Sequence, residues 1–535
     1  MTAIVETALF MLAVLAAVAV AAKRLNISPS ILLVVAGIGM ALIPGLPKVE
    51  LAPEVVLLVI LPPLIYSAGV AMSWREFKFN LRPIGLLAFG CVLFTTCAIA
   101  ATAHYLLNFD WAVGFLLGAI ISPTDVVAPL AIARQLGLPR RLEVVLEGEG
   151  LANDATALVL YRFAVVAVST GTFSLEHASI TFVFIVIGET IYGLAIGWLS
   201  LRLRQWAREP RVEITMSLMT PYLAFWIPAH LGGSGVLATV TCGLYVSWNG
   251  PRLIPFATRL QGIFFWDLII YLIEGLVFLV TGMQTRTLIE QTHAFSIREL
   301  VIATAWTTLI AIAARFIWVF PATYIPRWFS ERLRKRDPSP PWQSPFFLAF
   351  TGMRGVDSLA VALAIPFMVL DGQPFPHRDL ILFVTFGVII ITLIGQGLML
   401  PYVVRRLGLS RLGKKEHKDE IRAELRARQA ALKQVEKRLE KIIKEHDLPG
   451  EAIAHLRTRN QSRMQILPTN LTEGLDHMRQ TASIKAELIT AEREFIYQLL
   501  RDGKITDEAR RRIEYELDLE EAGVANRGRD GGGWM

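Results

Sequence analysis

The segment Ile121–Tyr161 reads ISPTDVVAPLAIARQLGLPRRLEVVLEGEGLANDATALVLY and places acidic groups inside two runs that are otherwise apolar. The acids within these runs are Asp125, Glu147, Glu149 and Asp154. A carboxylate in hydrocarbon is costly unless it faces a water-filled cavity or a partner. Acids at these positions therefore indicate an ion or proton path, and the rest of the chain supplies the frame around it.

The composition is that of a membrane protein. The mean hydropathy is +0.48. Of the 535 residues, 53% are hydrophobic and 19% charged, whereas soluble proteins carry about 25% charged residues. The net charge of +7 does not indicate nucleic-acid binding, because the basic residues lie mostly in short loops and in a mixed-charge tail. The cysteines, Cys91, Cys97 and Cys242, fall in apolar runs and predict neither a disulfide nor a zinc site.

The apolar runs predict an all-α membrane domain over residues 1–408, with about thirteen transmembrane helices of about 20 residues each. The runs lie near residues 4–22, 28–45, 53–72, 83–107, 110–136, 141–169, 177–201, 213–230, 233–248, 260–283, 298–320, 343–370 and 379–404. From residue 409 to residue 535 the composition changes to that of a charged, helix-forming tail, for which we predict a cytoplasmic, regulatory role.

The basic residues predict the orientation. They gather in the loops after the odd-numbered spans, whereas the loops after the even-numbered spans offer only Lys48, Arg286, Arg298 and Arg378. Cytoplasmic loops carry an excess of Lys and Arg. We therefore expect the N-terminus outside and the C-terminal tail in the cytoplasm.

Two predicted spans contain helix breaks. Ser122-Pro123 stands in the middle of span 5, where proline removes a backbone donor. Gly352 and Gly355 flank Arg354 in span 12. Unwound backbone at membrane depth survives only where it is buried in protein or lines a cavity. Spans 5 and 12 enter the membrane from opposite sides, which predicts two inverted repeats, spans 1–6 and 8–13, whose broken helices cross at the midplane.

Four short motifs resemble one known family. They are S-P-T-D at Ser122–Asp125, E-x-x-x-N-D at Glu149–Asp154, L-P-P-L-I-Y at Leu61–Tyr66 and G-M-R-G at Gly352–Gly355. Residues 1–410 resemble the monovalent cation:proton antiporter-1 family, which comprises bacterial Na+/H+ antiporters and their animal and plant relatives. The resemblance implies the same inverted repeats with crossing broken helices, and it does not extend to the tail.

The candidate transport site combines Asn153-Asp154 of span 6 with Thr124-Asp125 of span 5. A buried Asp beside an amide can release a proton and accept a dehydrated cation at the same carboxylate. At the break, freed carbonyls and the side chains of Thr124 and Asp125 can supply hard oxygen ligands. The alternative for Asp125 is a counter-charge at a half-helix N-terminus, where anions are favoured.

Glu149 and Arg354 predict a structural ion pair, because an unpaired buried Arg is very costly. The resemblance implies the same pairing, which would join spans 6 and 12. Asp357 lies three residues after Arg354 on the same helix face and is an acid that the family resemblance does not account for. It either shares Arg354 or reaches the transport path.

The chain departs from the family pattern at two positions. Gly150 stands where relatives often carry Ser, and Ser67 stands where they often carry an acid. We expect either weaker cation binding or a preference for a larger cation. Glu189 and Glu274 are single acids in other spans, and the run around Glu274 resembles the dimer-side helices of the family, which favours packing over transport and implies a homodimer.

The sequence contains no phosphate-binding loop, no metal-binding histidine cluster and no nucleophile elbow. We therefore expect neither an enzyme nor an ATP-driven pump, and no resident cofactor. In the tail, Ile421, Leu425, Leu432 and Val435 follow a heptad seam, which predicts either a dimeric coiled coil or a helix packed on the tail's own fold. The Gly-rich end, 528–533, is predicted to be disordered.

These patterns predict a secondary antiporter of the cell membrane that exchanges Na+, Li+ or K+ for protons by alternating access and serves pH homeostasis. The exchange is expected to be electroneutral, because Asn153 stands where a two-proton relative would carry a second Asp. Two alternatives remain, a K+/H+ antiporter of the same fold and a gated cation channel.

Overall fold

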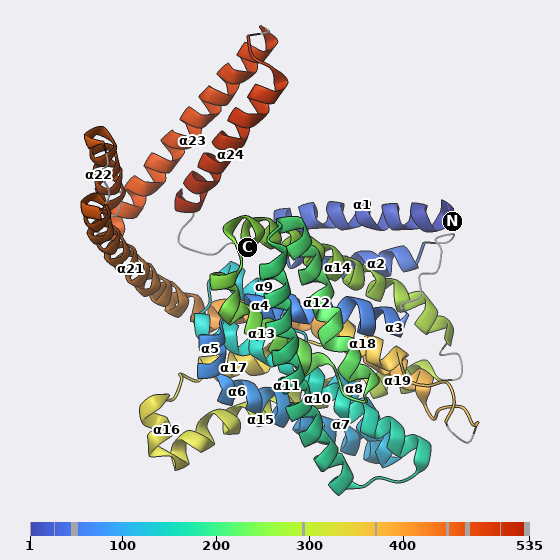
Figure 1. The fold of residues 1–535 in the computed structure, drawn as a ribbon. Coiled ribbons are helices and arrows are strands. Elements are labelled where there is room, and N and C mark those ends of the chain that lie inside the picture. The colour runs from blue at the N-terminus through green and yellow to red at the C-terminus, as the bar shows by residue number, and fades with distance from the viewer. Residues whose placement is uncertain are drawn as a thin grey trace. The chain divides into compact units, whose positions relative to one another are not determined.

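The computed structural model describes residues 2–25, 27–43, 52–291, 295–369, 372–445, 449–465, 471–502 and 504–528 (Figure 1). Within these ranges every regular element is helical, apart from one isolated β-bridge between Met368 and Pro374. This confirms the predicted all-α class.

The chain divides into two compact units, Met1–Gly413 and Lys414–Met535. The helices of the first unit up to the first break are α1 (Thr2–Leu25), α2 (Pro29–Ala41), α3 (Pro53–Val55), η1 (Val56–Ile60), α4 (Leu61–Ala71), α5 (Trp74–Phe79), α6 (Leu81–Gly85), η2 (Leu86–Cys91), α7 (Val92–Leu107) and α8 (Trp111–Ile121). Those that follow are α9 (Val127–Leu136), α10 (Arg140–Thr170), α11 (Leu175–Ala207), α12 (Pro210–His230), α13 (Val236–Leu253), α14 (Phe256–Gln291), α15 (Ile297–Phe329), α16 (Glu331–Arg336), α17 (Gln343–Phe350), α18 (Val356–Leu363), α19 (Arg378–Ile390), η3 (Ile391–Gln396) and α20 (Gly397–Leu407).

Eight helical stretches in the described residues are long and apolar enough to cross a membrane. They are Glu6–Leu25, Pro53–Ala71, Leu81–Leu107, Arg140–Thr170, Leu175–Ala207, Phe256–Glu290, Ile297–Phe329 and Arg378–Leu407. Shorter apolar helices are α2, α8 and α9. The protein is thus a multi-pass membrane protein, while the exact number of thirteen spans stays a prediction.

Both predicted helix breaks are present. Residues 122–126 separate α8 from α9, and residues 351–355 separate α17 from α18. The second half of the first broken helix starts where the Val127 amide donates to Asp125 Oδ1 at 2.9 Å. A side-chain oxygen that accepts from the first turn stabilises a helix start. Gly137, at φ +61°, ends this half-helix in the left-handed conformation.

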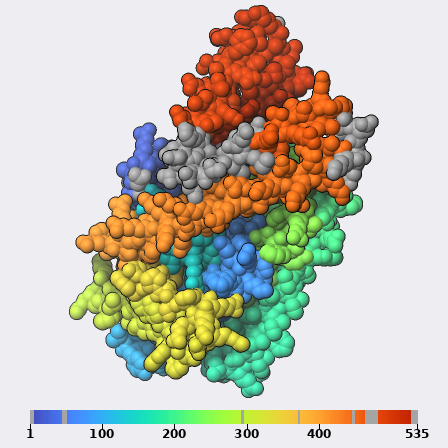
Figure 2. All heavy atoms as spheres, turned by 90° about the vertical axis from the view of Figure 1, so that its left-hand side faces the viewer, coloured from blue at the N-terminus to red at the C-terminus, as the bar shows by residue number. Residues whose placement is uncertain are grey.

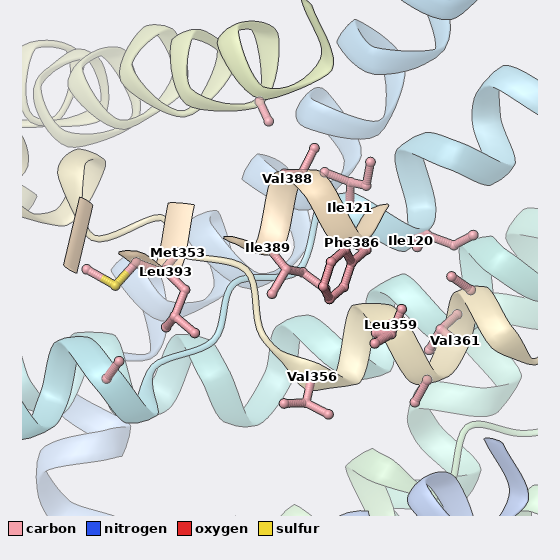
Figure 3. Packing of buried hydrophobic residues seen from close by; sticks show 14 of the residues in the cluster. Ile120, Ile121, Met353, Val356, Leu359, Val361, Phe386, Val388, Ile389 and Leu393 are labelled. Atoms are coloured by element: carbon pink, nitrogen blue, oxygen red, sulfur yellow. The ribbon is translucent and has the colours of Figure 1, made fainter. Parts of the chain in front are cut away.

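Apolar side chains pack the two broken helices together. Figure 3 shows Leu359 of α18 and Phe386 of α19 close to Ile120 and Ile121 of α8. Ile120, Ile121 and Leu359 are fully buried. This packing holds the polar breaks inside the protein, where unwound backbone is tolerated.

The carboxylate of Asp337 links several helices of the first unit through arginine side chains. Asp337, between α16 and α17, accepts from Arg327 at 2.6 Å and lies 2.8 Å from an Arg141 nitrogen. Arg82 lies 3.8 Å from the same carboxylate. Figure 2 shows the yellow segment that includes α16 beside the blue segment that includes α5 and α6.

The second unit contains α21 from Lys414 onward, and α22, α23 and α24. These four helices span Leu409–Glu445, Gly450–Gln465, Leu471–Arg501 and Asp507–Gly528. The last two run side by side as a helical hairpin with Ile489, Leu517 and Val524 buried between them (Figure 1). Along the predicted heptad seam Ile421 and Leu432 are buried, whereas Val435 is 46% exposed. The predicted disordered end lies, beyond Gly528, outside the described residues.

Candidate functional site

The two helix breaks meet at their backbones. The Asp125 amide donates to the Met353 carbonyl at 2.8 Å, so unwound segments from the two halves of the unit satisfy each other. A Cβ added to Gly355 would lie 2.4 Å from Asp125 Cβ, closer than real Cβ atoms come. A glycine is needed here because a side chain would push Asp125 out of place.

Asn153 of α10 holds the first break in position. Its Nδ2 donates to the Thr124 carbonyl at 2.9 Å and to Thr124 Oγ1 at 3.3 Å. Thr124 Oγ1 in turn donates to Glu149 Oε1 at 3.0 Å. The predicted ligands Thr124 and Asn153 are therefore part of one hydrogen-bond network that fixes the break against α10.

The predicted ion pair between Glu149 and Arg354 is wrong, because Glu149 pairs with Arg315. Arg315 of α15 binds both carboxylate oxygens of Glu149, at 2.5 and 2.8 Å, and both side chains are almost fully buried. Two parallel N–H···O bonds make such a pair strong and geometrically specific. The pair joins α10 to α15, in place of the link to the second break that the sequence suggested.

Arg354 satisfies its side chain with backbone oxygens. Its Nε donates to the Ile121 carbonyl at 3.0 Å, and its Nη atoms donate to the carbonyls of Gly352 and Ala311. The carbonyls of Ile121 and Gly352 lie at the two breaks, where helix ends leave backbone oxygens without helical partners, whereas Ala311 lies inside α15. It stabilises the crossing without a carboxylate.

Sequence reasoning overlooked Arg315. It is a single charged residue in the middle of a long apolar run, so its own burial predicts a carboxylate partner. The prediction assigned Arg354 to Glu149 instead, because Arg354 lies in the G-M-R-G motif. Both arginines are buried and both lie near Glu149, and only the side-chain geometry distinguishes them.

Three acidic residues at the crossing are only partly buried. Asp125, Asp154 and Asp357 are partly buried, whereas Asn153, Glu149 and Arg354 around them are sealed. Asp154 interacts electrostatically with both other acids. Within the described part of the chain, the carboxylates of Asp154 and Asp357 form no hydrogen bond and no ion pair.

Two oxygens at the site are buried without a hydrogen-bond partner, Asp125 Oδ2 and Asn153 Oδ1. A buried unsatisfied oxygen costs about 1–3 kcal/mol, so such atoms call for a ligand or a water. Hard oxygens of this kind suit a small alkali cation. No set of three His, Cys, Asp or Glu side chains in the described ranges is arranged to hold one metal ion. Neutral oxygens would therefore complete the coordination of a cation here.

Three further polar residues differ in their surroundings. Ser67 Oγ donates to the carbonyl of Leu64 in its own helix at 3.4 Å. Glu189 accepts from the amides of Ser234, at 2.5 Å, and Gly235, at 2.9 Å, and so caps the start of α13. Glu274 of α14 interacts electrostatically with Asp125. Glu274 therefore lies near one of the acids of the crossing.

Residues 10–406 match the family described as sodium/hydrogen exchanger, transmembrane. The Na+/H+ antiporter ApNhaP of Aphanothece halophytica is 35% identical over 76% of this chain and 74% of its own length. The sodium, potassium, lithium and rubidium/H+ antiporter of Bacillus pumilus is 33% identical over 68% of this chain and 56% of its own.

Two further proteins match this chain over more than nine-tenths of their own length. An uncharacterized Na+/H+ exchanger of Mycobacterium tuberculosis is 33% identical over 93% of this chain and 92% of its own length. The solved structure of the sodium proton antiporter MjNhaP1 from Methanocaldococcus jannaschii has a TM-score of 0.61 at 18% identity, covering 76% of this chain and 99% of that one. That likeness supports the fold, and the family match covers most of the sequence. The chain therefore belongs to the sodium/hydrogen exchanger family.

Proposed function

We propose that the protein exchanges a monovalent cation, Na+ in the first place, for protons across the membrane by alternating access. The observation that carries the proposal is the partly accessible, unpartnered carboxylate of Asp154 beside Asp125 at the crossing of two broken helices. The names of the relatives from Aphanothece halophytica and Bacillus pumilus support it.

In the proposed cycle a proton and a cation compete for Asp154. Burial disfavours an ionised carboxylate, so the carboxyl group holds either a proton or a cation. The orphan oxygens of Asp125 and Asn153 would complete the shell of a cation that has shed water. Neither cargo is a resident cofactor, and the proposal requires none.

Proteoliposomes test this function. An imposed Na+ gradient should drive proton flux that saturates with Na+ and stops without a counter-moving proton. Flux that does not saturate, or cation movement without proton movement, would identify a gated channel instead.

A second candidate is K+/H+ exchange with the same site. The name of the Bacillus pumilus relative includes potassium and rubidium, and Gly150 and Ser67 stand where relatives often carry a hydroxyl and an acid. A series of Li+, Na+, K+ and Rb+ in the same vesicles separates the two candidates by the apparent affinity for each cation.

We expect Asp125→Asn to weaken cation binding severely while proton-linked exchange remains detectable at high Na+. The substitution removes a charge whose Oδ2 is unpartnered but keeps an acceptor for the Val127 amide. The measurement is the Na+ concentration for half-maximal proton flux. An unchanged value would assign Asp125 to a purely structural role as a helix start.

We further expect one cation to exchange for one proton. Asn153 cannot titrate, and competition at the single carboxylate of Asp154 leaves the loaded carrier with the same charge in both directions. Membrane voltage, worth about 2.3 kcal/mol per charge per 100 mV, should then leave Na+-driven flux unchanged. Voltage set by a K+ gradient and valinomycin tests this where K+ is not a substrate. A flux that changes steeply with voltage would refute it.

The proposal includes an orientation in the membrane and an oligomeric state. The basic residues in alternate loops favour an external N-terminus and a cytoplasmic C-terminal unit in the cell membrane. The family resemblance of the run around Glu274 favours a homodimer. Cysteine labelling from either side, and mass measurement in detergent, test these two statements.

A further inference from the structure

We propose that Asp357 tunes the transport site through its negative charge, strengthening the binding of both the cation and the proton at Asp154. The inference rests on the proposed exchange function and deepens it. Asp357 lies in the first turn of α18, directly after the second break. The backbone bond between Asp125 and Met353 joins this break to the cation site.

A structural role does not account for Asp357. A buried carboxylate is normally paired, because an uncompensated charge away from water is strongly destabilising. Within the described residues Asp357 forms neither a hydrogen bond nor an ion pair. Arg354 is the cationic residue nearest to Asp357 in the sequence. Its side chain donates to the carbonyls of Ile121, Gly352 and Ala311, and not to Asp357.

The surroundings of Asp357 point to the transport site. Asp357 is only partly buried, as Asp154 is, and it interacts electrostatically with Asp154 and Asp125. Three acids of the same sign repel one another. An arrangement with that cost is stable only if a cation or a proton relieves it during the cycle.

Asp357 acts on Asp154 from a distance in this conformation, because the three acids are not arranged to hold one ion together. Other charged residues lie on the elements packed around the site and around α18. Glu274 on α14 interacts with Asp125 and with Arg134, and the ends of helices packed against α18 carry Glu54, Arg378 and Asp379. Asp357 itself interacts electrostatically with Asp154 and Asp125.

Such a field effect has a distinctive kinetic signature. Where Asp357 is ionised, its negative charge strengthens proton and cation binding at Asp154 by the same factor, since both ligands carry one positive charge. At alkaline pH, where protons do not compete, Asp357→Asn should raise the KM for Na+ by this factor. At acidic pH the weaker proton competition cancels the weaker Na+ binding, and KM should change little.

The expected increase at alkaline pH is about tenfold, which a unit charge produces at about 12 Å with an effective dielectric constant of about 20. Asp357→Glu, which keeps the charge, should keep the low KM. Asp379→Asn is the matched control, because it removes a carboxylate from a neighbouring helix start that is 47% exposed. It should leave KM unchanged at both pH values.

The experiment measures Na+-driven proton flux in proteoliposomes over a range of Na+ at both pH values. A rise in KM by equal factors at acidic and alkaline pH would make Asp357 a direct ligand and overturn the field role. An unchanged KM at alkaline pH would overturn it as well. If Asp357→Asn does not fold, Asp357→Ser is measured against the same criteria. Absence of exchange in the parent protein would instead contradict the proposed function.

Discussion

Asp154→Asn abolishes cation/proton exchange and leaves the protein folded in the membrane. This result is expected because the amide keeps the shape of the side chain but can neither release a proton nor balance a cation. No described residue bonds to the Asp154 carboxylate, so its loss removes no structural contact. The measurement is Na+-driven proton flux by the purified variant in proteoliposomes, at saturating Na+.

Thermal unfolding in detergent provides the control for this variant. It should match that of the parent protein, and Asp379→Asn should retain full exchange. Substantial exchange by a well-folded Asp154→Asn protein would remove Asp154 from the centre of the mechanism. Asp125 or Asp357 would then have to carry the proton.

Loss of either Glu149 or Arg315 should destabilise the protein by about 3–5 kcal/mol, the usual cost of leaving one buried charge without its partner. Both side chains are at most 3% exposed, so solvent does not screen the pair. The double variant Glu149→Gln/Arg315→Met should lose much less than the sum of the two single losses, because residues in contact are not additive. Unfolding in detergent measures the three free energies.

Arg354 supplies the matched comparison. Glu149→Gln/Arg354→Met should show a smaller coupling than the pair with Arg315, because Arg354 donates to backbone oxygens. If the coupling energy were larger for Arg354 than for Arg315, the pairing implied by the sequence would be right and the observed geometry would not represent the stable state.

The sequence predicted the breaks because their causes are local. Pro123 removes a backbone donor at one break, and Gly352 and Gly355 permit an irregular backbone at the other. The positions of these residues therefore indicate where the helices unwind. The acids at the crossing were also recognisable, since charge inside an apolar run is visible without a structure. Asp154, Asp125 and Asp357 were all identified in this way.

The pairing of buried charges could not be predicted in the same manner. Glu149 has two buried arginines nearby, and the choice between them depends on which side chain has other oxygens to bind. Arg354 finds carbonyls that are free only because the breaks expose them. These carbonyl acceptors are positioned only when the two broken helices have packed together, so the sequence does not reveal them. The hydrogen bond from Thr124 to Glu149 was missed for the same reason.

The junction between the two breaks is made of backbone atoms, from the Asp125 amide to the Met353 carbonyl. Every amino acid except proline carries that amide, and every residue carries that carbonyl. The bond itself therefore does not depend on which side chains stand at positions 125 and 353, although Gly355 beside it must stay without a side chain. A substitution beside the junction can change the side chains that face the site and leave this backbone bond in place.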